Sequence, residues 1–65
     1  MLLNVREYVV SEARKNPLFA DALHDYLAGD VVRFKQTVNA LASASLATYK
    51  EVRDAVITEG LMMEG

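Results

Sequence analysis

The chain has 65 residues and no cysteine, so it has room for a single small domain, residues 1–65, without disulfide support. A single core of this size gives a folding stability of only about 3–5 kcal/mol. A small chain that is 52% hydrophobic also leaves apolar side chains on its surface. Both points predict a homo-oligomer, and we expect a homodimer. The formal charge of −2 gives no overall attraction to nucleic acid, and one histidine without cysteine excludes the familiar zinc frameworks. We therefore expect no metal and no cofactor.

The first predicted helix covers residues 5–15. Asn4 is its candidate N-cap, and Glu7 follows three residues later, which is the spacing of a capping box. A β-strand over residues 2–10 is the alternative, because this stretch is rich in β-branched residues. On the helix, five apolar side chains are expected to face inward: Leu2, Val5, Val9, Val10 and Ala13.

The second predicted helix covers residues 17–28. Asn16 is a candidate N-cap, Pro17 suits the first helical position, and Gly29 suits a left-handed C-cap. The expected apolar face consists of Phe19, Ala22, Leu23, Tyr26 and Leu27. The expected solvated face carries Asp21, His24 and Asp25. These three are the chain's only cluster of catalytic residue types, but no nucleophile lies near them in the sequence, so we interpret them as a polar surface.

The most regular pattern predicts one continuous helix over residues 31–59. Asp30 is its candidate N-cap, and Gly60 is expected to end it, which leaves residues 61–65 as a short apolar tail. At 100° per residue one apolar stripe keeps its phase through the whole segment. The stripe consists of Val31, Phe34, Val38, Leu41, Ala42, Ser45, Thr48, Tyr49, Val52, Ala55 and Val56. The predicted fold is therefore all-α, with two short helices packed on one long helix.

The length of the third helix predicts a contact outside one compact domain. About 29 residues at 1.5 Å each give roughly 43 Å, about twice what a globule of this size uses. The alternative is a break near residues 43–45 and a new helix from Thr48, which forms a second capping-box pattern with Glu51. We favour the continuous helix because its phase is kept and neither Gly nor Pro interrupts it.

Apolar side chains outside the main stripe are candidates for a contact surface. On a continuous helix Val32, Leu46 and Ile57 lie along one line away from the core. Arg6 lies in the apolar sector of the first helix. Its alkyl stem could carry the guanidinium to the surface, or the guanidinium could pair with a carboxylate of a partner. The remaining candidates are small residues that let helices approach closely and adaptable methionines: Ala40, Ala44, Ala47, Met62 and Met63.

We expect a small non-enzymatic protein–protein interaction module, an adaptor or inhibitor that masks a surface on a macromolecular partner. It has no phosphate-binding glycine loop and little room for a pocket that excludes water. One alternative is a DNA-binding regulator with a helix-turn-helix in residues 30–59, and another is a structural subunit of a larger assembly such as a phage particle. Without a signal peptide or a sufficiently long apolar span, a cytoplasmic accessory protein, of a phage for example, is expected.

Overall fold

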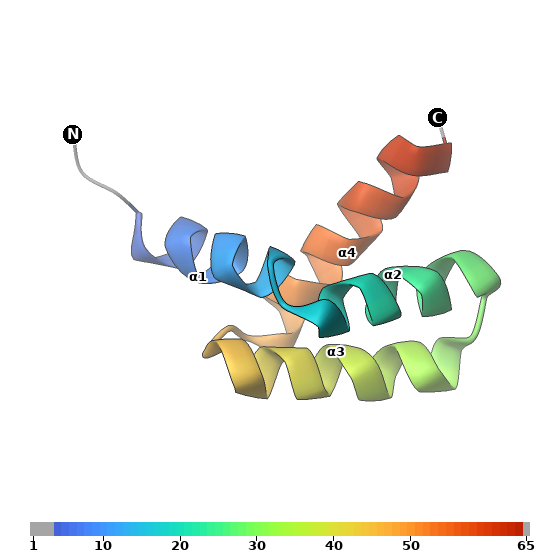
Figure 1. The fold of residues 1–65 in the computed structure, drawn as a ribbon, viewed down its shortest axis with the longest axis horizontal. Coiled ribbons are helices and arrows are strands. Elements are labelled where there is room, and N and C mark those ends of the chain that lie inside the picture. The colour runs from blue at the N-terminus through green and yellow to red at the C-terminus, as the bar shows by residue number, and fades with distance from the viewer. Residues whose placement is uncertain (1–3, 65) are drawn as a thin grey trace.

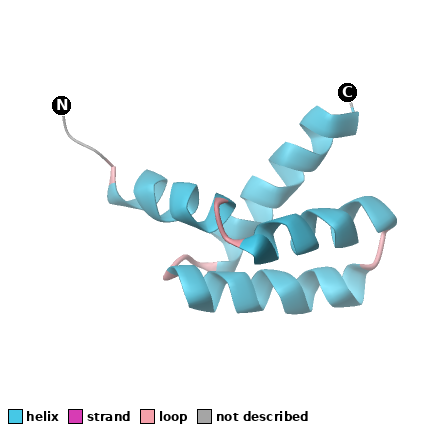
Figure 2. Cartoon of the chain, in the orientation of Figure 1, coloured by secondary structure: helices cyan, strands magenta, loops and turns pink. Residues whose placement is uncertain are grey.

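Residues 4–64, which the computed structural model describes, form four α-helices and no strand (Figure 1). Short loops join the helices, as Figure 2 shows. The helices are α1 (Val5–Arg14), α2 (Pro17–Ala28), α3 (Val31–Ser45) and α4 (Tyr49–Glu64). The all-α prediction is confirmed, but the prediction of three helices is wrong. α1 also ends one residue early, because Lys15 is its C-cap.

The first two helices begin at the predicted caps. The Asn4 side chain accepts a hydrogen bond of 2.8 Å from the Arg6 N–H, and the Asn16 side chain accepts one of 2.9 Å from the Leu18 N–H. Each cap satisfies a backbone donor that the first turn of a helix leaves free. Gly29 ends α2 with a φ of 74°, as the glycine pattern predicts.

The chain is helical from Val5, so the alternative strand is wrong for residues 5–10. Of the side chains expected to face inward, Ala13 is buried and Val9 and Val10 are half-buried. Val5 is 69% exposed, and Leu2 lies outside the described residues. In α1 only Val10 and Ala13 contact the hydrophobic core, so α1 meets the other helices through its second half.

The predicted continuous helix 31–59 is wrong, because the chain leaves the helix at residues 46–48. Leu46 ends α3 in the left-handed conformation with a φ of 57°. The Ala47 N–H then donates a hydrogen bond of 3.1 Å to the Ala42 carbonyl, which satisfies an acceptor at the helix end. The alternative with two helices is therefore correct.

A reciprocal capping box starts α4. The Thr48 hydroxyl accepts a hydrogen bond of 3.1 Å from the Glu51 N–H, and the Thr48 N–H donates one of 2.9 Å to the Glu51 carboxylate. The apolar stripe of the sequence keeps its phase across this turn, although its residues belong to two helices that pack in one core. Hydrophobic periodicity therefore did not reveal the break, whereas the local capping pattern did.

Gly60 lies inside α4, and the helix continues through Glu64. The predictions that Gly60 ends the helix and that residues 61–65 form a separate tail are therefore wrong for the described residues. Gly60 is buried beside the ring of Tyr26, which explains a glycine at a position that is not a cap. Its missing side chain allows α2 and α4 to approach closely.

The four helices share one core. α2 and α3 run antiparallel and make the most extensive contact, α4 crosses this pair, and the radius of gyration is 11.4 Å (Figure 1). Val31 and Leu27, predicted to face inward, are exposed, whereas Asp25, predicted to be solvated, is only 8% exposed. The buried apolar residues are Ala13, Phe19, Ala22, Phe34, Val38, Leu41, Ala42, Val52, Ala55 and Val56.

Candidate interaction surfaces

The end of α4 carries the clearest apolar surface. Leu61, Met62 and Met63 are consecutive, and their exposed fractions lie between 57% and 72%. In Figure 1 this end of α4 projects away from the other helices. Successive side chains on a helix point about 100° apart, so Met62 and Met63 lie on neighbouring faces and Leu61 lies nearly opposite Met63. Exposed apolar side chains grouped within one helical turn are more informative than single exposed residues elsewhere.

The two methionines continue the buried face of α4. Met63 follows Val56 by seven residues, and Met62 follows Ala55 by seven, so each methionine lies two turns beyond a core residue on nearly the same face. Val56 and Ala55 are buried, but the methionines are not, because α4 extends past the helices that cover its earlier turns. The helix face that forms the core is thus left uncovered over its last described turn. We call Met62 and Met63 the α4 patch.

The proposed line of Val32, Leu46 and Ile57 does not exist as one helix face. Val32 is exposed on α3 and Leu46 is 84% exposed at its C-cap, whereas Ile57 lies on α4 and packs partly against the core. The line depended on a continuous helix, so the break at Leu46 removes its geometric basis.

The small residues of the candidate surface are also separated. Ala40 and Ala44 are exposed on α3, which leaves them accessible to another molecule. Ala47 is half-buried in the loop before α4 and packs against the core. Close packing inside the chain thus explains Ala47, while Ala40 and Ala44 stay candidates for an interface.

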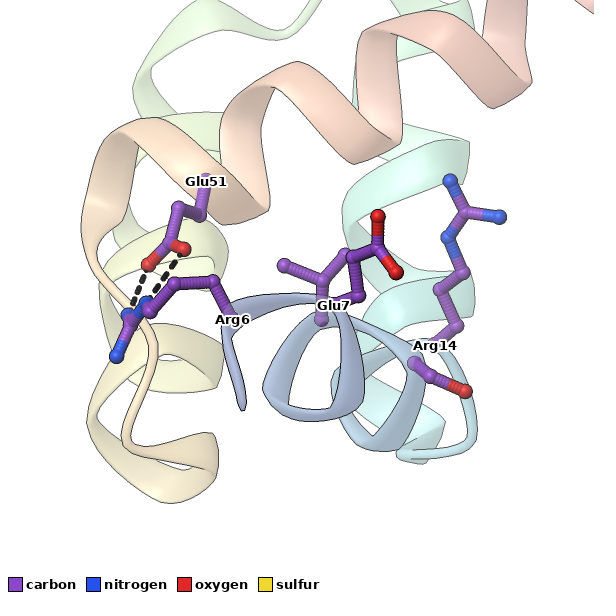
Figure 3. A pocket seen from close by; sticks show the side chains of 6 residues that line it. Arg6, Glu7, Arg14 and Glu51 are labelled. Carbon is purple, nitrogen blue, oxygen red and sulfur yellow. Dashed lines mark hydrogen bonds and ion pairs between the residues drawn. The ribbon is translucent and has the colours of Figure 1, made fainter. Parts of the chain in front are cut away.

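Arg6 pairs within its own chain, so the predicted pairing with a partner's carboxylate is not needed to explain it. The Arg6 Nε donates a hydrogen bond of 2.9 Å to Glu51 Oε2, and its Nη2 donates to Oε1, which gives a two-pronged pair (Figure 3). This pair joins the exposed first half of α1 to the first turn of α4.

The same contacts shift both pKa values in the direction of the charged forms. The hydrogen bond from Arg6 lowers the pKa of Glu51 to about 2, and the hydrogen bond from the Thr48 N–H contributes further. The pKa of Arg6 is raised by its hydrogen bond to Glu51. Glu51 therefore caps α4 and holds α1 at once. The spacing of Thr48 and Glu51 indicated the cap, but no sequence signal indicated the partner in α1.

An open surface pocket of about 360 Å³ lies beside this ion pair. In Figure 3 the Arg6–Glu51 pair stands on one side of it, Glu7 near its centre and Arg14 on the other side. Val10 and Ser11 complete the lining. Both charge types are present in it, and Arg6 and Glu51 neutralise each other, so it selects no particular charge.

A second pocket, of about 340 Å³, contains the predicted polar cluster of α2. Asp25 accepts a hydrogen bond of 2.9 Å from the Thr37 hydroxyl, and Arg33 lies 3.9 Å from the same carboxylate. Asp25 therefore links α2 to α3. Asp21 and His24 are exposed beside it, and no three potential ligands among the described residues are placed to hold a metal ion.

Comparisons of the chain with protein-family models, curated proteins and solved structures find no match. Within residues 4–64 no helix has the length and apolar character needed to cross a bilayer. The candidate function therefore rests on the surface chemistry of the fold.

Proposed function

We propose that the protein is a non-enzymatic protein–protein interaction module that masks a surface on a partner, as an adaptor or an inhibitor. The uncovered end of α4 carries this proposal, because Met62 and Met63 continue a core-forming helix face and yet are 72% and 60% exposed. Methionine is unbranched and polarizable and adapts to different apolar partners. A helix face of this kind is a common element of protein recognition.

Self-association is the second candidate function, through an exposed apolar side chain outside the α4 patch. The helix-length argument for a homodimer fails, because the break at residues 46–48 folds both helices onto one core. The exposed Leu46, at the C-cap of α3, is the observation that favours a dimer. If self-association repeats, the protein would be a structural subunit of a larger assembly such as a phage particle. This alternative predicts large particles instead of dimers.

DNA binding is the third candidate, since α3 and α4 are joined by a three-residue turn as in a helix-turn-helix. The electrostatics oppose it. Arg53, a cation near the start of α4, is hydrogen-bonded to Asp54 at 3.0 Å, and Glu51 carries a negative charge beside Lys50. Phosphates approaching this helix meet carboxylates as well as cations.

Quantitative capture from cell extract at low and high salt tests the proposal. A partner held by apolar contact stays bound at high salt, is lost with Met62→Ser/Met63→Ser, and is retained by the matched control Leu46→Ser. Equal capture by all three forms contradicts the role of the α4 patch. Captured DNA that dissociates steeply with salt favours the helix-turn-helix candidate.

Light scattering over a wide concentration range separates self-association from a foreign partner. The proposal predicts a monomer at low concentration, because the chain buries its own core. A stable dimer that Leu46→Ser dissociates assigns the Leu46 surface to a second copy, whereas a dimer that Met62→Ser/Met63→Ser dissociates assigns the α4 patch to it. Particles of high mass instead support the structural-subunit alternative.

A further inference from the structure

We infer that the α4 patch receives a basic amphipathic helix of another protein, whose apolar side chains cover Met62 and Met63 and whose Lys or Arg side chains meet Glu59. This inference rests on the proposed function and specifies the chemistry of the partner. Its basis is the position of Glu59 within the patch and the distribution of charge over α2 and α4.

Glu59 lies on the same face of α4 as the methionines. It precedes Met62 by three residues and Met63 by four, which are the spacings of neighbouring side chains on a helix. Glu59 is half-buried, and it forms no ion pair with any residue from 4 to 63. A carboxylate beside apolar side chains, with no cationic partner in the part of the chain that the structure describes, suits a cation supplied from outside.

The surroundings of the patch are acidic. Gly60 contacts Tyr26, so α2 is the helix beside the second half of α4. Neither α2 nor residues 54–64 contain Lys or Arg, and all seven basic residues of the chain lie elsewhere. Five of the nine acidic residues lie in these two segments, but Asp21 and Asp25 share a pocket with Arg33 of α3, and Asp54 is hydrogen-bonded to Arg53. Glu59 is therefore the carboxylate beside the methionines that has no cationic partner among residues 4–63. A basic segment is therefore attracted to this end of the molecule, whereas an acidic one is repelled.

The same charges disfavour a second copy as the occupant. Two copies that meet through the ends of α4 bring Glu59 and the adjoining acidic segment of each close to those of the other, without Lys or Arg from either segment. Like charges at an interface weaken association. A helix that carries apolar and basic side chains on one face can cover the methionines and also pair with the Glu59 carboxylate.

The test uses three designed peptides of equal length with the full chain. The first is an amphipathic Leu–Lys helix, the second has Glu in place of Lys, and the third has the first composition in an order without an apolar face. Fluorescence anisotropy of labelled peptides measures affinity. We expect the first peptide to bind roughly tenfold tighter than either of the others at low salt.

Three variants locate the binding. Met62→Ser/Met63→Ser is expected to abolish it, and Glu59→Gln to remove most of the preference for Lys over Glu. Leu46→Ser is the matched control and should leave binding unchanged, because Leu46 is an exposed apolar side chain at the end of α3. All substituted side chains are exposed or half-buried, so circular dichroism should show unchanged helix content.

Each other outcome overturns the inference in a distinct way. Equal affinity for the Lys and Glu peptides, still dependent on Met62 and Met63, rejects the basic partner but leaves the proposed function intact. Binding of none of the peptides rejects the inference, and the proposed function also fails if capture from extract is independent of the methionines. Methionine-dependent binding to neutral phosphatidylcholine vesicles, without peptide binding, assigns the patch to a lipid surface instead.

Discussion

Gly60 in α4 approaches the ring of Tyr26 in α2 so closely that a Cβ atom at position 60 would lie 2.5 Å from the ring carbon Cε2. The ring in turn lies 5.9 Å, between centroids, from that of Phe34 in α3, so three helices converge at Tyr26. Gly60 also lies two residues before Met62, the first residue of the α4 patch. The contact between Gly60 and Tyr26 therefore sets where α4 leaves the body of the protein.

Gly60→Ala is expected to destabilise the protein, although alanine favours helix. Overpacking against the ring costs about 1–3 kcal/mol, and helix propensity returns about 1 kcal/mol, so the net loss is at most about 2 kcal/mol. In a Tyr26→Ala background the same change should instead stabilise by up to about 1 kcal/mol. Urea unfolding of the four forms measures this reversal, and an equal effect in both backgrounds contradicts the close contact.

Acid should weaken the link between α1 and α4. Glu51 has a pKa of about 2 in the folded protein, below its value in the unfolded chain, so its contribution to stability is fully present above roughly pH 4.5 and is lost as the pH falls toward 2. Glu51→Gln should flatten this part of the stability curve. In Arg6→Met the pKa of Glu51, followed by NMR, should rise yet stay lowered by the Thr48 N–H. An unchanged pKa in Arg6→Met contradicts the ion pair.

The two left-handed residues should respond oppositely to substitution. Leu46 adopts φ 57° with an 84% exposed side chain, so Leu46→Gly relieves backbone strain and removes little packing. Strain relief of about 1–2 kcal/mol against a glycine entropy cost of about 0.5–1 kcal/mol predicts a gain of up to about 1.5 kcal/mol. Gly29→Ala, at φ 74°, should lose about 1 kcal/mol. Thermal unfolding measures both, and a destabilised Leu46→Gly would show that the Leu46 side chain packs in solution.

Loss of the Thr37 hydroxyl should destabilise the α2–α3 contact. Thr37→Val leaves the buried Asp25 carboxylate without its hydrogen bond of 2.9 Å, at a cost of about 1–3 kcal/mol. Thr37→Ser keeps the donor and should cost less. Denaturant unfolding of both variants provides the comparison, and equal losses would mean that the methyl group, not the hydroxyl, stabilises this contact.

Local patterns predicted much of the secondary structure. Asn4, Asn16 and Gly29 mark helix ends through their own hydrogen bonds or backbone conformation, and each lies where the sequence placed it. The Thr48–Glu51 capping box also marked the start of α4 correctly. The apolar stripe keeps its phase from residue 31 to residue 56, and this favours a continuous helix. The phase of a stripe does not by itself show whether its two halves belong to one helix.

The candidate surface was less predictable, because exposure depends on which helices lie opposite one another. Met62 and Met63 were identified as adaptable apolar residues, yet their continuation of the α4 core face is visible only once Gly60 is inside the helix. Glu59 had no sequence signal as a contact residue. Ile57, a predicted surface residue, packs partly against the core instead.

Local patterns were enough to predict the all-α class, the caps of the first two helices and most of the core, because these depend on interactions within a few residues and on apolar periodicity. Three features emerge only in the folded chain: Arg6 pairs with Glu51, Asp25 is buried, and Gly60 packs under Tyr26 within α4. These contacts join residues far apart in the chain. Their partners are chosen by the packing of whole helices, which no local pattern encodes.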